Sequence, residues 1–177
     1  MYLEFILLIA DYYRTISKRI FFFEWLFPFI IGIGIFALLY FGSSTTGTNV
    51  FKDNAINLLG ILVGFSITII TILTTGQGQN LEEIKNKSTI IIINKKPITL
   101  FRLLLINFTY SVIMEVGLII VCLIYPMLIE NLNINRNVKY VGFSILVFLI
   151  IHIMLLTMRN LTDFYLILIK PSKNASA

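Results

Sequence analysis

The chain has 177 residues, of which 58% are hydrophobic and only 13% are charged, about half the charged fraction of an average soluble domain. Its mean hydropathy is +0.91. This composition excludes a soluble globular domain and a disordered chain, because so much apolar surface cannot remain in water. The length leaves room for one domain, and once the membrane spans are subtracted no separate catalytic domain remains.

The net charge is +5, from 14 Lys and Arg against 9 Asp and Glu. In a soluble protein such an excess indicates nucleic-acid binding, but in so apolar a chain the placement of the basic residues across a membrane matters more. We therefore expect no direct nucleic-acid contact. The single cysteine, Cys122, cannot form an internal disulfide or a metal site, which excludes a disulfide-stapled exported domain.

Residues 1–18 are predicted to form an amphipathic helix on the membrane surface. Leu3, Leu7 and Ala10 recur at helical spacing, whereas Asp11 and Arg14 take other faces. A cleaved signal peptide is not expected, because the apolar part precedes the basic residues and no small-residue cleavage site follows. The alternative to the interfacial helix is a frayed hydrophobic terminus.

Four apolar runs follow, each close to the ~20 residues that cross a hydrocarbon core. They cover residues 20–41, 55–75, 103–129 and 141–158. The runs are too long and too uniformly apolar to be the strands of a membrane barrel. The sequence therefore predicts a single all-α domain over residues 1–177, an integral membrane four-helix bundle with an N-terminal interfacial helix.

The positive charges predict how the bundle is oriented. Eleven of the 14 Lys and Arg fall in the N-terminal segment, the loop of residues 76–102 and the C-terminal tail, and three fall on the other side. Cytoplasmic segments retain Lys and Arg. Both termini and the loop of residues 76–102 are therefore expected in the cytoplasm, with the bundle in a bacterial inner membrane.

Polar side chains inside the spans are costly in hydrocarbon, so each is a candidate functional residue. Counting ~1.5 Å per helical residue from the nearest basic flank places Glu24, Asn107 and His152 roughly 8 to 10 Å deep, in one layer. Thr68 and Thr71 fall near the same depth, counted from the end of the second run. These residues are candidates for a hydrated vestibule or a proton-sensitive latch, since histidine titrates near neutral pH. The alternative is a buried network that only holds the bundle together.

Glu115 stands apart, thirteen residues past Arg102 and thus roughly 20 Å deep. On the same scale His152 is offset from it by about 9 Å, so a direct bond between the two is not assumed. Two interpretations of Glu115 remain. A ring of such carboxylates in an oligomer would select cations, whereas a neutral glutamate would be hydrogen-bonded across helices.

Gly60 and Gly64 form a small-xxx-small pair in the second span, and Thr68 and Thr71 extend the same face. Small residues let helices approach closely. The stripe therefore predicts a helix contact inside the bundle or between subunits, with the lining of a pore as a further alternative.

The loop of residues 76–102 is the only sizeable soluble surface that the sequence predicts. Its acidic pair precedes lysines, which favours a short helix, and Pro97 favours a restart into the third span. Residues 90–93 are four isoleucines, which we expect to pack on the membrane surface or to dock a cytosolic partner. The basic residues expected to contact anionic lipid or that partner are Lys85, Lys87, Lys95 and Lys96.

Sequence motifs for catalysis are missing. The chain contains no phosphate-binding glycine loop, no metal-ligand spacing and no nucleophile paired with a base. Its aspartates lie outside the predicted spans, which also argues against an intramembrane aspartyl protease. We therefore expect no enzyme, no cofactor and no metal site.

Two local patterns resemble small four-span membrane proteins of bacterial antiphage systems. They read Glu115-Val116-Gly117, followed after four residues by Cys122, and Ile151-His152-Ile153 upstream of Asn160-Leu161-Thr162. Together with the long basic loop, they are similar to the membrane subunit of the Rex exclusion system and, more loosely, to the transmembrane subunit of Kiwa. The N-terminal amphipathic segment and the spacing from His152 to Asn160 depart from that pattern.

The resemblance implies an inner-membrane protein that is encoded with a cytosolic defence partner and that acts as an infection sensor or a membrane-depolarising channel. The alternative is a non-conducting membrane anchor that recruits a soluble effector through residues 76–102. A homo-oligomer is expected, because four spans enclose little space for the polar groups they carry. A solute carrier is not supported, since the two halves show no evident inverted repeat.

Overall fold

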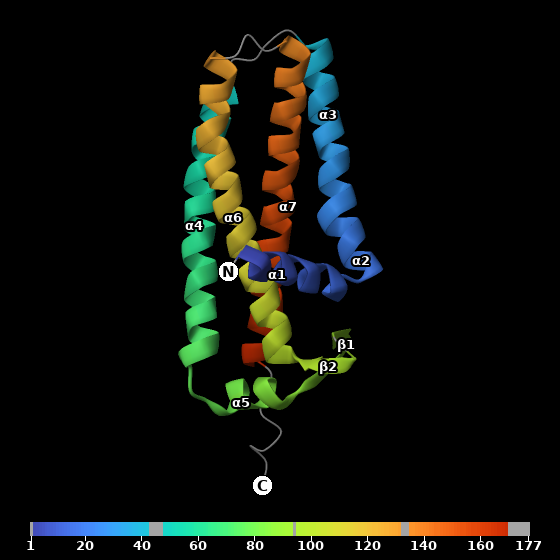
Figure 1. The fold of residues 1–177 in the computed structure, drawn as a ribbon, viewed down its shortest axis with the longest axis vertical. Helices are drawn as coiled ribbons and strands as arrows, with labels where there is room; N and C mark the ends of the chain where they lie inside the picture. The colour runs from blue at the N-terminus through green and yellow to red at the C-terminus, as the bar shows by residue number, and fades with distance from the viewer. Residues whose placement is uncertain (1, 43–47, 94, 132–134, 170–177) are drawn as a thin grey trace.

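A computed structural model of the protein describes residues 2–42, 48–93, 95–131 and 135–169 (Figure 1). In chain order its elements are α1 (Tyr2–Thr15), α2 (Lys18–Phe21), the π-helical turn η1 (Phe22–Leu26), α3 (Phe27–Phe41), α4 (Thr48–Thr75), α5 (Gln79–Asn86), β1 (Ser88–Ile93), β2 (Lys96–Thr99), α6 (Leu100–Asn131) and α7 (Arg136–Ile169). Stretches long and apolar enough to cross a membrane are Lys18–Phe41, Val50–Thr75, Leu100–Tyr125 and Arg136–Leu166. The predicted helical fold with four membrane spans and a short N-terminal helix is confirmed.

The third and fourth spanning helices continue beyond the predicted apolar runs. α6 has 32 residues and α7 has 34, roughly 50 Å each at the helical rise, whereas a hydrocarbon core is about 30 Å thick. The predicted end of the fourth run at residue 158 is wrong, because α7 continues to Ile169. A basic residue was expected to mark the membrane boundary, but Arg159 is paired inside the protein with Glu24.

The long helices are arranged in the order α4, α6, α7, α3, which differs from their order in the chain (Figure 1). α3 packs on α7, α7 on α6, and α6 on α4. Gly32 permits the first of these contacts: a Cβ atom there would lie 3.2 Å from the Cβ of Phe148 and 3.3 Å from the carbonyl oxygen of Ser144. Since α3 and α4 stand at the two ends of this row, only 17% and 22% of their spans are buried.

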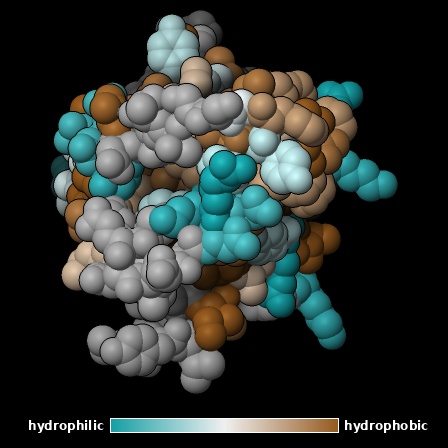
Figure 2. Space-filling view, turned by 90° about the horizontal axis from the view of Figure 1, so that it is seen from above, coloured by the Kyte–Doolittle hydropathy of each residue, from teal (hydrophilic) through white to brown (hydrophobic). Residues whose placement is uncertain are grey.

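Apolar side chains fill the interior toward the end of the bundle that carries the α3–α4 and α6–α7 connections. Leu59 of α4, Leu118 and Cys122 of α6, and Ile150 of α7 are among the buried residues of this cluster. Figure 2 looks down on this end, where hydrophilic and hydrophobic residues are interspersed around the helix ends. A polar interior therefore begins only farther along the bundle.

The residues between α4 and α6 fold into α5 and an antiparallel hairpin of β1 and β2, at the end of the bundle that we predict to be cytoplasmic. α5 agrees with the predicted short helix. The predicted restart at Pro97 is wrong, because Pro97 pairs with Ile92 in the hairpin and α6 begins at Leu100. A proline is tolerated in a two-stranded sheet, whose strands both have a free edge.

The hairpin explains the run of four isoleucines. Alternate side chains of a strand point to opposite faces, so Ile90 and Ile92 are exposed, by 99% and 65%, while Ile93 is 2% exposed. The buried face packs against α1, which crosses the bundle near the start of α2 (Figure 1). One face of the isoleucine run is thus part of the core, and the other is free to contact a membrane or a partner.

Candidate functional site

A proline in the first span creates the first polar feature of the site. Pro28 lies four residues after Glu24, and because proline has no N–H, the Glu24 carbonyl cannot receive its usual helical hydrogen bond. The helix widens here into η1, in which the N–H of Phe27 donates to the carbonyl of Phe22. The freed Glu24 carbonyl instead accepts a hydrogen bond from Nδ1 of His152, on α7, at 2.5 Å.

This bond determines the orientation of the His152 ring. A carbonyl oxygen only accepts, so Nδ1 donates, and Nε2 remains buried without a partner among the described residues. The ring packs against Trp25, with centroids 4.4 Å apart. His152 therefore contacts the backbone of Glu24 and not its carboxylate, which is not the imidazole–carboxylate pair expected of a proton-sensitive latch.

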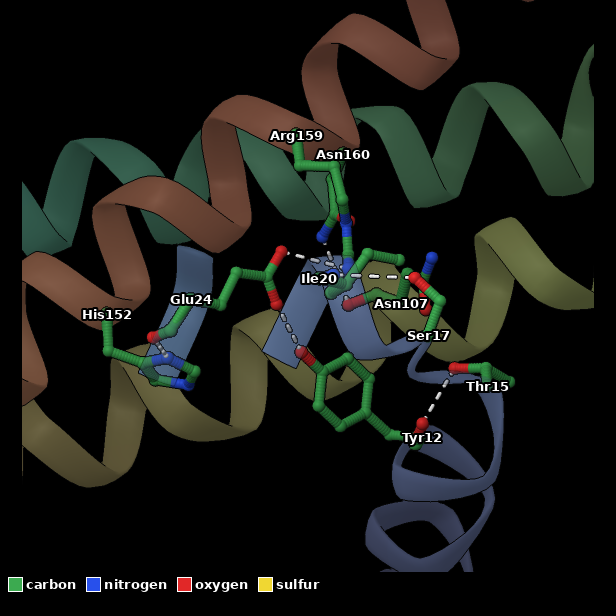
Figure 3. A network of polar contacts seen from close by, with 9 residues as sticks. All are labelled: Tyr12, Thr15, Ser17, Ile20, Glu24, Asn107, His152, Arg159 and Asn160. Atoms are coloured by element: carbon green, nitrogen blue, oxygen red, sulfur yellow. Dashed lines mark hydrogen bonds and ion pairs between the residues drawn. The ribbon is translucent and has the colours of Figure 1, made fainter. Parts of the chain in front are cut away.

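The Glu24 carboxylate joins three segments of the chain (Figure 3). Its Oε2 accepts a hydrogen bond from the Tyr12 hydroxyl of α1 at 2.8 Å, and its Oε1 lies 2.9 Å from Nη1 of Arg159 on α7. The second contact is an ion pair by distance, without the alignment of a hydrogen bond. Glu24 is only 3% exposed. Removing Glu24 or Arg159 alone would leave the other as an uncompensated buried charge, so the two charges depend on each other.

The network continues from Arg159 into the contact between α6 and α7. Nη2 of Arg159 donates to Oδ1 of Asn160 at 3.4 Å, and Nδ2 of Asn160 donates to the backbone carbonyl of Asn107 at 3.2 Å. The structure thus brings together Glu24, Asn107 and His152, the three residues placed in one layer by the sequence. Their partners come from α1, α6 and α7, so the network connects the N-terminal helix to two spanning helices.

Tyr12 also holds α1 against the bundle by packing. Its ring is fully buried and stacks on Tyr110 of α6, with centroids 3.6 Å apart and planes 6° apart. Near the surface, Asp11 lies 3.2 Å from Arg14 and 3.6 Å from Arg102. Burial and then the nearby Glu24 carboxylate raise the pKa of Tyr12 far above its ordinary value, so the phenol keeps the proton that it donates.

A second polar cluster surrounds Glu115 where α4, α6 and α7 meet. Its Oε1 accepts hydrogen bonds from Ser111 at 2.9 Å, Thr157 at 3.0 Å and Ser66 at 3.3 Å. The hydroxyl oxygens of Ser111 and Thr157 lie 3.1 Å apart. Glu115 is fully buried in its own chain. This orientation agrees with a glutamate hydrogen-bonded across helices, and the ring of Glu115 carboxylates between subunits stays a prediction.

The distance along α6 from the α1 contact to Glu115 is shorter than the depth that the count of residues from Arg102 assigns to Glu115. Tyr110, which stacks on Tyr12, precedes Glu115 by five residues, or roughly 8 Å of helix. The count from Arg102 assigns roughly 20 Å, because it takes the start of α6 as the membrane boundary. Glu115 therefore lies near the middle of α6, whose bounds are Leu100–Asn131.

The small-residue stripe of the second span lies on the outer surface of the bundle. Thr68 and Thr71 are exposed, and their hydroxyls donate to the carbonyls of Gly64 and Ile67 in their own helix, at 2.8 Å and 2.9 Å. A Cβ added at Gly60 or Gly64 would meet no atom of the described residues within 4 Å. Both threonines face away from α6 and α7, so within one chain the structure does not bring them together with Glu24. A contact of the stripe inside the bundle is contradicted.

The lysines expected to contact lipid or a partner are all exposed at the predicted cytoplasmic end. Lys85 and Lys87 lie in α5 and directly after it, and Lys95 and Lys96 lie at the turn of the hairpin. Nζ of Lys85 lies 5.8 Å from the ring centroid of Phe101. Among the contacts of the described residues, none joins these lysines to the two polar clusters.

Several residues of the two clusters were not among the sequence candidates. They are Tyr12, Ser66, Ser111, Thr157, Arg159 and Asn160. One signal could have revealed Ser111: it precedes Glu115 by four residues, which places both on one helix face. The sequence does not show which way the side chains of Tyr12 and Arg159 turn, so their inward orientation is visible only in the structure.

No family model, curated protein or solved structure matches the chain. Within the described residues, no group of three or more His, Cys, Asp or Glu could hold a metal ion. The chemistry available to the site is therefore that of two buried carboxylates with their hydroxyl, guanidinium and amide partners.

Proposed function

We propose that the chain is an oligomeric membrane subunit of a bacterial antiphage defence system, which acts in the inner membrane as an infection sensor or a depolarising channel with a cytosolic partner. The observation that carries this proposal is the contact of α1 with the buried Glu24–Arg159 pair. Tyr12 reaches from a helix on the side of the bundle to charges in its interior. A displacement of α1 would therefore break a hydrogen bond to a charge pair that joins two spanning helices.

Contacts of unequal strength hold α1 in place. A hydrogen bond to a charged group contributes about 1.5–3 kcal/mol, whereas an exposed ion pair such as Asp11–Arg102 contributes about 0–1 kcal/mol. Ile6 and Leu7 of α1 remain exposed, as expected of a helix whose apolar face contacts the membrane surface. A change at that surface would act on α1 first. The release of Tyr12 would remove its hydrogen bond to Glu24 and expose the Glu24–Arg159 pair.

The defence role is supported by the two sequence patterns that resemble antiphage membrane subunits. Their members Glu115, Cys122, His152 and Asn160 are all fully buried in the bundle. Three of the four belong to the polar clusters described above. The polar residues of the two patterns that lie in the interior are thus available to a shared mechanism, whereas Val116 and Leu161 of the same patterns are exposed.

Oligomerisation is supported by the exposed stripe on α4. Gly60 and Gly64 leave a shallow face without side chains, which permits close approach of another helix. Replacing both glycines by leucine should reduce the oligomer detected by cross-linking in membranes without unfolding the monomer. Gly34→Leu is the matched control, since Gly34 is equally open but lies on α3. Loss of the oligomer in the Gly34 variant alone would place the interface on α3.

The defence proposal is tested in a phage-sensitive host that expresses the chain with its neighbouring genes. We expect protection from at least one phage of a broad panel, with protection lost in Tyr12→Ala. The absence of protection from every phage would refute the defence role. A membrane-potential dye then separates the two modes: depolarisation on infection supports the channel, and protection with an unchanged potential refutes the channel and favours the sensor.

The second candidate is a non-conducting anchor that recruits a soluble effector. It is favoured by the exposed face of the hairpin, where Ile90 and Ile92 lie beside lysines at the predicted cytoplasmic end. Under this function Ile90→Asp with Ile92→Asp should abolish protection, whereas Tyr12→Phe should leave it intact. The reverse result favours the switch built on α1.

A further inference from the structure

We propose that the oxygen atoms around Glu115 form a binding site for a monovalent cation, with Na⁺ as the ion to be tested. The site would consist of the Glu115 carboxylate and the hydroxyls of Ser66, Ser111 and Thr157. This binding function goes beyond the defence role proposed above and does not depend on it.

The first observation is an unbalanced carboxylate. All three hydroxyls donate to Oε1 of Glu115, whereas Oε2 is buried and has no hydrogen-bond partner among the described residues. Buried carboxylate oxygens are nearly always paired, because an unpaired one loses its hydration without compensation. Oε2 therefore needs a partner that the described part of the chain does not supply.

The second observation is the missing counter-charge. Within the described residues, the ion pairs of the acidic side chains involve Asp11, Asp53 and Glu24, and no Lys, Arg or His lies within ion-pair distance of Glu115. Arg159 is near in sequence to Thr157 but turns toward Glu24. If Glu115 is ionised, its charge is unpaired, and if it is protonated, the proton on Oε2 has no acceptor. A bound cation resolves both conditions.

The chemistry of the ligands selects the kind of cation. Carboxylate and hydroxyl oxygens are hard ligands, which suit alkali and alkaline-earth ions rather than transition metals. The cluster holds one carboxylate, so a monovalent ion gives a neutral site, whereas a divalent ion would leave a net positive charge in an apolar interior. Each hydroxyl has one proton and two lone pairs, so it can donate a hydrogen bond and still coordinate an ion.

The site also joins three helices. Ser66 lies on α4, Ser111 and Glu115 on α6, and Thr157 on α7. A cation held by these oxygens would bind the folded bundle and not the separated helices, so it should raise thermal stability. Ion binding would thereby strengthen the contact of α4 with α6, next to the exposed stripe of α4.

The test uses the full-length protein purified in detergent and radioactive Na⁺ as the probe. At constant ionic strength in choline chloride, we expect saturable binding of one Na⁺ per chain, displaced by unlabelled Na⁺. Glu115→Gln keeps the side-chain size but removes the charge, and should weaken binding by about tenfold or more. Asp53→Asn, which removes an exposed carboxylate of α4 outside the two polar clusters, is the matched control and should bind Na⁺ as the wild type does.

Thr157→Val and Ser66→Ala provide a second test that keeps Glu115 in place. Each should weaken Na⁺ binding and reduce the rise of Tm produced by Na⁺ over choline. The proposal is overturned if the wild type shows no saturable binding, or if Glu115→Gln, Thr157→Val and Ser66→Ala all bind Na⁺ as tightly as the wild type. Because the readout is ion binding by the purified chain, failure of the defence assay would not alter its outcome.

Discussion

Replacing Tyr12 by phenylalanine tests whether α1 is coupled to the interior of the bundle. The substitution removes only the hydroxyl that donates to Oε2 of Glu24 at 2.8 Å. The ring of phenylalanine can still stack on Tyr110, so packing is largely kept. We expect α1 to detach more often, while the four spans remain folded.

The size of the effect follows from the contacts that remain. A hydrogen bond to a charged group contributes about 1.5–3 kcal/mol, so its loss should raise the equilibrium constant for detachment of α1 by about tenfold to a hundredfold. The aromatic stack, about 0.5–1.5 kcal/mol, and the Asp11 ion pairs, about 0–1 kcal/mol each, remain to hold the helix. Detachment should therefore become measurable without becoming complete.

Two measurements report on α1. Hydrogen exchange followed by mass spectrometry should show faster exchange of the α1 amides, by a factor similar to the change in the detachment equilibrium. Trp25 is the only tryptophan in the chain, and its ring centroid lies 5.8 Å from that of Tyr13 on α1. Its fluorescence should change in the same variant, because part of its surroundings leaves with α1.

Tyr165→Phe is the matched control, since Tyr165 is exposed on α7 and its hydroxyl takes no part in the contacts described for α1. It should alter neither measurement. If Tyr12→Phe leaves the exchange of α1 and the Trp25 fluorescence unchanged, the hydrogen bond to Glu24 does not hold α1, and the coupling of α1 to the spans is refuted.

Further predictions concern helix packing and pH. Gly32→Ala should destabilise the bundle by about 1 kcal/mol or more, because the added Cβ would lie 3.2 Å from the Cβ of Phe148. Gly34→Ala, at an open position of the same helix, should not destabilise it. Equal midpoints of denaturant unfolding in the two variants would contradict the close approach of α3 and α7. The raised pKa of Tyr12 means that its contribution to α1 docking is complete below the ordinary tyrosine pKa of about 10 and declines as the pH rises above it. Trp25 fluorescence of the wild type should therefore change above about pH 10 more than that of Tyr12→Phe, because the detached Tyr12 loses its proton there. Identical pH profiles would show that the proton of Tyr12 does not contribute to the docking of α1.

The spanning helices were predictable because each is apolar over its length, and a helix in hydrocarbon must satisfy its own backbone. The amphipathic N-terminal segment was predictable for a similar reason, from the spacing of its apolar residues. The hairpin was not predicted. Its isoleucines suit a strand as well as a membrane surface, and only their pairing with residues 96–99 selects the strand.

The candidate site was predictable in part. Counting residues along the helices placed Glu24, Asn107 and His152 at one level, and the structure joins them in one network. The same count placed Thr68 and Thr71 at that level, yet they face outward. The pairing of Arg159 with Glu24 depends on the contact of α7 with η1, which the sequence does not show.

The sequence by itself determined the number of spans, the presence of an even number of crossings, and the approximate depth of each polar residue along its helix. Only the tertiary structure decided which helices are neighbours and how each helix is rotated about its axis. The physical reason is that hydrophobicity is counted along the chain, whereas rotation and partners depend on contacts between segments far apart in sequence. Glu115 shows the difference most clearly: its span was evident from the sequence, but its three hydroxyl partners come from three helices.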